Sequence, residues 1–107
     1  MNSVTPLELK QWLDDSSRAA PALLDVREGW ELERAQLRGA LHIPMSALGA
    51  RFGELDPAAE LVVLCHHGAR SARVCMALEM RGFARVYNLT GGIDGWSNQV
   101  DPAVPRY

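Results

Sequence analysis

The chain is poor in cysteine, in long apolar runs and in net charge. Its two cysteines, Cys65 and Cys75, are too few for a disulfide framework, which excludes the class of small disulfide-stapled domains. No apolar run approaches the ~20 residues that a membrane-spanning helix needs, so we expect no membrane partner. The net charge of −2 gives no reason to expect nucleic acid as a partner.

The stretch MNSVTPLELK, residues 1–10, also lacks the pattern of a secretory signal, because no basic start is followed by an apolar core. We therefore expect a cytoplasmic protein. A reducing compartment keeps thiols free, so the two cysteines become candidates for chemistry rather than for cross-linking.

What the chain does have is the composition of a globular domain. Its 107 residues are 48% hydrophobic and 22% charged, which is typical of a folded domain and not of a disordered or fibrous chain. A chain of this length buries roughly two-thirds of the surface that it exposes when unfolded. We predict one domain that spans residues 1–107.

Short apolar runs alternate with amphipathic segments along the chain. The first helix is expected to begin at Pro6, because Thr5 is a good N-cap and Glu8 completes a capping box, and to end around residues 14–17. Strands are predicted at residues 22–26, 40–44, 61–64 and 84–89, and further helical segments at residues 29–39 (helix or loop), 45–55, 71–83 and after the double glycine 91–92. This alternation predicts an α/β fold, in which a parallel sheet carries helices on both faces.

The clearest strand, Leu61–Leu64, runs directly into a polar turn that starts at Cys65. In parallel sheets, ligands bind at the carboxyl ends of the strands, which places this cysteine where a site is expected. Gly68 allows the turn to curl, so that successive N–H groups point inward beside the amino end of the next helix. Such a nest stabilises a thiolate, the reactive form of cysteine, and suits a bound anion.

Other interpretations of these side chains remain open. A cysteine after an apolar strand is often a small buried residue, although the polar turn favours a position of Cys65 outside the core. His66 and His67 are either loop residues that face water or, with Arg70, a source of positive charge for the nest. A zinc site made from Cys65 and the two histidines is disfavoured, because adjacent side chains point different ways. Cys75 lies mid-helix on the apolar stripe and is interpreted as core packing.

Two further segments contain candidate residues. Asp25 ends a predicted strand, so it either lies near the same crevice or caps a loop. The segment GGIDGW, residues 91–96, is interpreted as structural, with glycines for tight backbone and Trp96 for packing against the sheet.

Four motifs of this chain resemble those of the rhodanese family and occur in the family's order. They are LLDVRE at residues 23–28, RGALHIP at residues 38–44, CHHGARS at residues 65–71 and GGIDGW at residues 91–96. The third looks like the family's active-site loop, C-x-x-G-x-R-S, in which the cysteine comes first. One difference is the segment Ala35-Gln36-Leu37, where the family often has Gly-His-Ile.

The resemblance implies a rhodanese-like three-layer fold with about five parallel strands and helices on both faces. It also implies that Cys65 takes a sulfane sulfur from a donor such as thiosulfate, holds it as a persulfide and passes it to cyanide, a thiol or a protein partner. Inward N–H groups would hold the persulfide's charge, as an oxyanion hole does. The implied substrate-binding residues are His66, His67, Gly68, Ala69, Arg70 and Ser71, with Asp25 and Arg27 as supporting residues. Neither a metal nor an organic cofactor is expected.

Two alternatives to sulfur transfer are compatible with this fold. Related phosphatases and arsenate-type anion enzymes use a loop that is one residue longer, C-x5-R, to enclose a tetrahedral anion. Here Arg70 gives C-x4-R, and the smaller ring suits a single sulfur better. A non-catalytic rhodanese-like binding module is the other alternative, although such modules usually lack the cysteine that this chain has.

Overall fold

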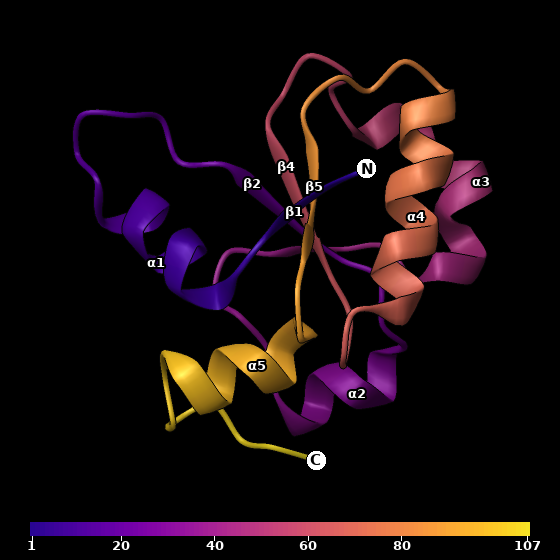
Figure 1. Cartoon of the computed structure of the whole chain (residues 1–107). Helices are drawn as coiled ribbons and strands as arrows, with labels where there is room; N and C mark the ends of the chain where they lie inside the picture. Colours follow the sequence, from indigo (N-terminus) through magenta and orange to yellow (C-terminus); the bar gives the residue numbers. More distant parts are fainter.

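A computed structural model describes the whole chain, residues 1–107, and Figure 1 shows a sheet flanked by helices. The five strands are all parallel and lie in the order β1-β5-β4-β2-β3. The elements are β1 (Asn2–Val4), α1 (Pro6–Asp14), β2 (Ala22–Asp25), α2 (Gly29–Arg34), β3 (Leu41–His42), the 3-10 turn η1 (Met45–Ala47), α3 (Leu48–Arg51), the 3-10 turn η2 (Phe52–Glu54), β4 (Leu61–Leu64), α4 (Ala69–Met80), β5 (Val86–Leu89) and α5 (Gly92–Gln99). This architecture confirms the predicted α/β fold with a five-stranded parallel sheet.

The central strand β4 is buried on both faces, which explains why its sequence is continuously apolar. Side chains alternate across a strand, so β4 contributes to two separate cores. Leu61 and Val63 pack in one core with side chains of α3 and α4, whereas Val62 and Leu64 pack in the other with side chains of α1 and α5. Figure 1 shows these two pairs of helices on opposite sides of the sheet. Helices on both faces are therefore confirmed.

The start of α1 is held by the predicted capping box. The Glu8 amide donates to the Thr5 hydroxyl oxygen over 3.1 Å, and the Thr5 amide donates to the Glu8 carboxylate over 2.9 Å. These two bonds satisfy amide groups that the first turn of a helix leaves without partners. The helix ends at Asp14, within the predicted interval.

The strand β1 was not predicted from the sequence. It has three residues, of which only Val4 is buried, and it pairs with β5 at the edge of the sheet. A strand this short and polar has no apolar periodicity of its own, so its pairing depends on the neighbouring strand.

The helical segments differ from prediction mainly at their ends. Residues 45–55 form two 3-10 turns around the four-residue helix α3, instead of one short helix. The helix predicted from residue 71 begins earlier, at Ala69, because Gly68 takes a left-handed conformation (φ 113°) and serves as its N-cap. No helix in the chain has both the length and the apolar composition required to span a membrane.

The carboxyl ends of β2 and β4 meet at one edge of the sheet. Asp25 is the register partner of Leu64, and the Val26 amide donates to the Leu64 carbonyl over 3.1 Å. The residues that follow the two strands therefore lie at the same edge, where α2 and the first turns of α4 and α5 also gather (Figure 1). This edge holds the cysteine turn.

Candidate active site

The turn after β4 wraps its backbone around the sulfur of Cys65. The Gly68 amide donates to Sγ over 3.1 Å, the Ser71 amide over 3.4 Å, and the Ser71 hydroxyl oxygen lies 3.3 Å from Sγ. Burial opposes ionisation of the thiol, but the hydrogen bonds from Ser71, Gly68 and the Arg70 amide outweigh it and lower the pKa of Cys65. The predicted nest is therefore formed, although the amides of His66, His67 and Ala69 make no hydrogen bond to the sulfur.

Cys65 is more deeply buried than the sequence suggested. The expectation that the polar turn would bring it out of the core is wrong, because the residue is only 1% exposed and packs in the same apolar cluster as Val26 and Val74. The sulfur thus lies at the floor of the turn, with apolar side chains behind it and amide groups in front. A substrate atom must enter the turn to reach it.

The amino end of α5 holds the outer side of this turn. The Ile93 amide donates to the Cys65 carbonyl over 2.9 Å, and the Asp94 amide donates to the His66 carbonyl over 3.1 Å. Gly92 makes the approach possible, because a Cβ atom there would lie 2.4 Å from the His66 carbonyl oxygen, and its φ is +60°. The interpretation of GGIDGW as a structural motif is therefore right. The motif also has a specific task, because two of its amides bind the carbonyl groups of Cys65 and His66.

Ser71 connects the turn to a polar residue of β5 that the sequence analysis missed. Its hydroxyl has a single hydrogen and three acceptors within reach: Cys65 Sγ, the Gly68 carbonyl oxygen at 3.2 Å and the Asn88 side-chain oxygen. The Asn88 amide donates in turn to the Gly68 carbonyl over 3.2 Å. Because bonds to charged acceptors are stronger, we expect the Ser71 hydrogen to turn to the sulfur when Cys65 is ionised. The signal in the sequence was an asparagine, Asn88, within the predicted strand VYNL.

Arg70 does not direct its charge into the turn. Its guanidinium binds the Glu31 carboxylate of α2 through two hydrogen bonds of 2.7 Å. Of the positive charges considered for the nest, that of Arg70 is therefore held in an ion pair with Glu31 beside the turn. The hydrogen bonds from Arg70 outweigh the effect of burial and lower the pKa of Glu31 to about 2. Glu31 itself was missed: its carboxylate accepts the Glu28 amide over 2.8 Å, but Glu28 is not a usual N-cap residue, so no capping-box signature marks this position in the sequence.

Asp25 and Arg27 form a buried ion pair behind α2 and make no hydrogen bond with Cys65. The Arg27 Nη2 donates to Asp25 over 2.7 Å and to the Ala35 carbonyl over 2.8 Å, and both charged side chains are almost fully buried. Asp25 also accepts the Arg27 amide over 3.1 Å, as a local cap would. The contacts are compatible with both interpretations of Asp25, because it makes a local capping bond and its register partner Leu64 directly precedes Cys65.

Tyr107 links this ion pair to the cysteine turn. Its hydroxyl accepts from Arg27 Nη1 over 2.9 Å and donates to the Glu31 carboxylate over 2.9 Å. A chain of hydrogen bonds thus runs from Asp25 through Arg27, Tyr107 and Glu31 to Arg70 at the start of α4. Asp25 and Arg27 are thus connected to the cysteine turn through Tyr107 and Glu31, and their supporting role stays a prediction.

A family model described as the rhodanese-like domain matches residues 5–99 of this chain. The chain belongs to the rhodanese-like domain family. The match includes the whole cysteine turn, α2 and the amino end of α5, which are the parts that build the geometry described above.

Rhodanese-like relatives match the chain over different shares of their own length. A sulfurtransferase of Allochromatium vinosum is 33% identical over 104 residues, covering 97% of this chain and 95% of that protein. The thiosulfate sulfurtransferase GlpE of Actinobacillus pleuropneumoniae is 32% identical over 85 residues, covering 79% of each chain. The chloroplastic Rhodanese-like/PpiC domain-containing protein 12 of Arabidopsis thaliana is 42% identical over 89 residues, covering 79% of this chain. This chain spans only 30% of that plant protein, and less than half of several other relatives.

Among solved structures, a rhodanese-like domain protein from Staphylococcus aureus superposes with a TM-score of 0.85 at 28% identity, covering 100% of this chain and 99% of that chain. The similarity therefore extends from β1 to the segment after α5. The unpredicted strand β1 lies within the superposed region.

The second cysteine of this rhodanese-like chain is a packing residue. Cys75 is fully buried on α4, in the same apolar cluster as Leu78 and Phe83. Burial raises the pKa of the Cys75 thiol to about 12, so it stays protonated at neutral pH. The prediction that Cys75 belongs to the core is confirmed.

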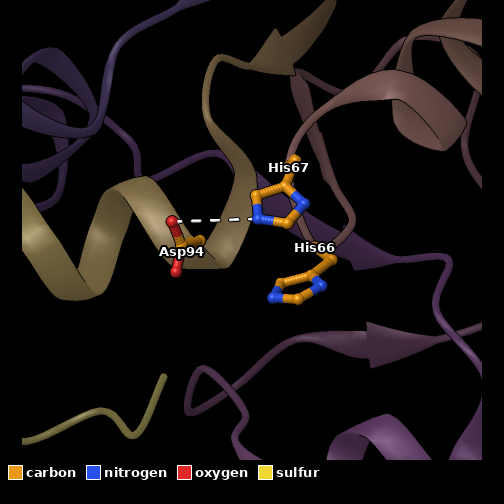
Figure 2. A group of neighbouring side chains, drawn as sticks. All are labelled: His66, His67 and Asp94. Atoms are coloured by element: carbon orange, nitrogen blue, oxygen red, sulfur yellow. Dashed lines mark ion pairs between the residues drawn. The ribbon is translucent and has the colours of Figure 1, made fainter. Parts of the chain in front are cut away.

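The two histidines of the turn lie together, contrary to expectation. The rings of His66 and His67 stack with centroids 3.9 Å apart, and His66 stacks on its other side against Tyr107, also at 3.9 Å. His67 is exposed and approaches Asp94 of α5 to 3.9 Å (Figure 2). Adjacent side chains were expected to point different ways, and for His66 and His67 this expectation is wrong.

Proposed function

We propose that this protein is a sulfurtransferase in which Cys65 carries a sulfane sulfur as a persulfide. The observation that carries the proposal is the set of hydrogen bonds that the turn directs at Cys65 Sγ. Those bonds favour the thiolate, which is the nucleophilic form. Two relatives that the chain matches over most of their length are named as sulfurtransferases, which supports the same chemistry.

In the first step, the Cys65 thiolate attacks the outer sulfur of a donor such as thiosulfate. The new Sγ–S bond forms as the donor's own S–S bond breaks, and sulfite leaves with the bonding electron pair. The enzyme then holds Cys65 as a persulfide anion, with the outer sulfur about 2.0 Å beyond Sγ. The charge of this anion lies on the outer sulfur, and we expect the N–H groups of the turn, two of which (those of Gly68 and Ser71) donate to Sγ, to stabilise it.

In the second step, a thiophilic acceptor attacks the outer sulfur. Cyanide leaves as thiocyanate, whereas a thiol, on a small molecule or on a protein partner, becomes a persulfide. The Sγ–S bond breaks in either case, and its electron pair returns to Cys65 as thiolate. Cys65 is therefore a thiolate at the start and at the end of each cycle. A rigid set of amide donors stabilises such a negative charge without having to rearrange.

The alternative of a phosphatase is disfavoured by the position of Arg70. Phosphoryl transfer needs an arginine aimed at the oxygens of the transferring group. Here the guanidinium is already bound at two points by Glu31, and the loop is one residue shorter than C-x5-R. We expect turnover of thiosulfate and little or no turnover of aryl phosphates by the unaltered protein. Phosphate release without persulfide formation would overturn the assignment.

Mass spectrometry of the protein after incubation with thiosulfate tests the central step directly. We expect a gain of ~32 Da, the mass of one sulfur, on the peptide that contains Cys65. The Cys65→Ser variant should show no gain, and the Cys75→Ala variant should gain the same mass as the unaltered protein. A binding module without sulfur-transfer activity would show no gain in any of the three.

A further inference from the structure

A second cluster of side chains lies on the outer side of the cysteine turn. It consists of His66 and His67 of the turn and Asp94 of α5, and each residue has one potential ligand atom within 4.8 Å of the other two. In Figure 2 the two imidazoles lie one above the other, with the carboxylate beside them. None of the hydrogen bonds that stabilise Cys65 comes from these three side chains. The sulfur-transfer chemistry therefore leaves their arrangement unexplained.

The ring of His66 contains a buried nitrogen without a partner. Its Nε2 is shielded from solvent and has no hydrogen bond, while the ring is held between His67 and Tyr107. Leaving a buried polar atom unpaired costs about 1–3 kcal/mol, so such an atom in a folded protein calls for an explanation. An imidazole nitrogen with a free lone pair is a good ligand for a borderline metal ion.

Asp94 supplies a carboxylate on the other side of the cluster. It is bound by Arg106 through contacts of 2.9 and 3.0 Å, but the Arg106 side chain is 59% exposed. Exposed ion pairs of this kind contribute little stability, so a divalent cation is able to displace the arginine. The amide of Asp94 is fixed to the His66 carbonyl, which keeps this carboxylate next to the turn.

We propose that His66 Nε2, His67 and Asp94 form a binding site for a borderline divalent cation such as Zn²⁺. Two imidazoles and one carboxylate are a donor set that zinc accepts, and they leave the fourth tetrahedral position for water or an anion. The proposal does not depend on the sulfur-transfer function, because Cys65 is not one of the ligands.

Binding requires one local rearrangement. Bonds of about 2.0 Å in a tetrahedral site bring ligand atoms to about 3.3 Å from one another, which is closer than the present limit of 4.8 Å. Stacked rings direct their lone pairs in parallel, so one ring must tilt out of the stack. His67 is the ring that moves, since its side chain is 67% exposed, whereas His66 is held by Tyr107.

Metal titrations of the Cys65→Ser variant test the site, because this variant removes the thiolate as a competing ligand. Zn²⁺ binding is followed by calorimetry, and Co²⁺ binding by the visible absorption of a tetrahedral complex. We expect a saturable site, with a shift of the His66 Nε2 resonance in imidazole ¹⁵N spectra. Adding His67→Ala or Asp94→Asn should weaken binding by at least about 10-fold.

Arg106→Ala is the matched control, because it removes the ion pair to Asp94 and leaves all three ligands. We expect Zn²⁺ to bind this variant at least as tightly as the protein with Arg106, since a competing cation has been removed. The proposal is overturned if Cys65→Ser binds no Zn²⁺, or if His67→Ala and Asp94→Asn bind it as tightly as their parent. A shift confined to nitrogens other than His66 Nε2 also overturns it. Circular dichroism of each variant establishes that the fold is intact.

Discussion

Glu31 of α2 binds Arg70 of α4 in a two-point ion pair, with both N–O distances at 2.7 Å. The carboxylate is nearly buried, whereas the arginine side chain is 35% exposed. The pair holds α2 against the first turn of α4 and cancels a positive charge that would oppose the helix dipole there. The hydrogen bonds to Sγ come from the turn itself, and the ion pair fixes the position of Arg70 beside it.

Stability at acid pH should report the Glu31–Arg70 pair. The pKa of Glu31 is lowered to about 2 in the folded protein from an ordinary value of 4.5. A lowered folded pKa contributes stability that is complete above about pH 4.5 and is lost as the pH falls towards about 2. We expect Glu31→Gln to lower the free energy of unfolding at pH 7 by on the order of 1–2 kcal/mol, given the exposure of Arg70.

The measurement is denaturant unfolding of Glu31→Gln and unaltered protein between pH 2 and 7. The variant should lack the part of the acid-induced loss that Glu31 causes. Glu33→Gln is the control, because Glu33 is an exposed carboxylate on the same helix without an ion pair. If the free energy of unfolding depends on pH equally in the unaltered protein and in Glu31→Gln, the Glu31–Arg70 pair does not contribute to the loss of stability at acid pH.

The two cysteines should differ in what their removal costs. Cys65→Ser is expected to abolish thiosulfate-to-cyanide transfer, because the proposed persulfide has no other carrier. Cys75→Ala should keep the activity and lose on the order of 1 kcal/mol of stability, as for a small buried truncation. Steady-state assays and urea unfolding of both variants check this. If Cys65→Ser keeps its activity, or if only Cys75→Ala loses it, the assignment of Cys65 as the nucleophile is wrong.

The reactivity of Cys65 should depend on Ser71. Since hydrogen bonds to Sγ outweigh burial and lower the pKa of Cys65, its alkylation rate should rise with a midpoint below that of a free thiol, ~8.5. Ser71→Ala should raise that midpoint, because the hydroxyl no longer stabilises the thiolate. Ser97→Ala is the matched control: this buried serine bonds only the Ile93 carbonyl, at 3.1 Å. A midpoint for the unaltered protein at or above the pKa of a free thiol would show that the turn does not stabilise the Cys65 thiolate.

The contact between α5 and the cysteine turn should tolerate no side chain at Gly92. Alanine there places a Cβ within 2.5 Å of two carbonyl oxygens at a positive φ, so the helix end must move away from the turn. We expect Gly92→Ala to cost more than about 2 kcal/mol of stability and to slow Cys65 alkylation. Gly49→Ala on α3 is the control, because its added Cβ meets nothing within 4 Å. Alkylation of Gly92→Ala at the unaltered rate would show that the carbonyl anchors are dispensable.

Much of the fold could be predicted because its signals are local. The capping box at Thr5 and the apolar run Leu61–Leu64 each specify an element through neighbouring residues, and the structure contains both. The helix α4 was also predicted, but its start at Ala69 was placed two residues too late, because the left-handed conformation of Gly68 was not recognised as an N-cap. The edge strand β1 could not be predicted in this way, because only its pairing with β5 makes it a strand.

The order of residues in the sequence determined that Cys65 follows a buried strand and precedes a helix. The turn between these two elements then brings backbone amides to its sulfur. That outcome follows from backbone geometry over the seven residues 65–71. Tertiary structure alone decided which side chains support the turn. Glu31 and Arg70 are 39 residues apart, Ser71 and Asn88 are 17 apart, and Tyr107 reaches Glu31 across 76. Such pairs form only when packed elements bring them together, because no local periodicity or cap encodes a contact between distant segments.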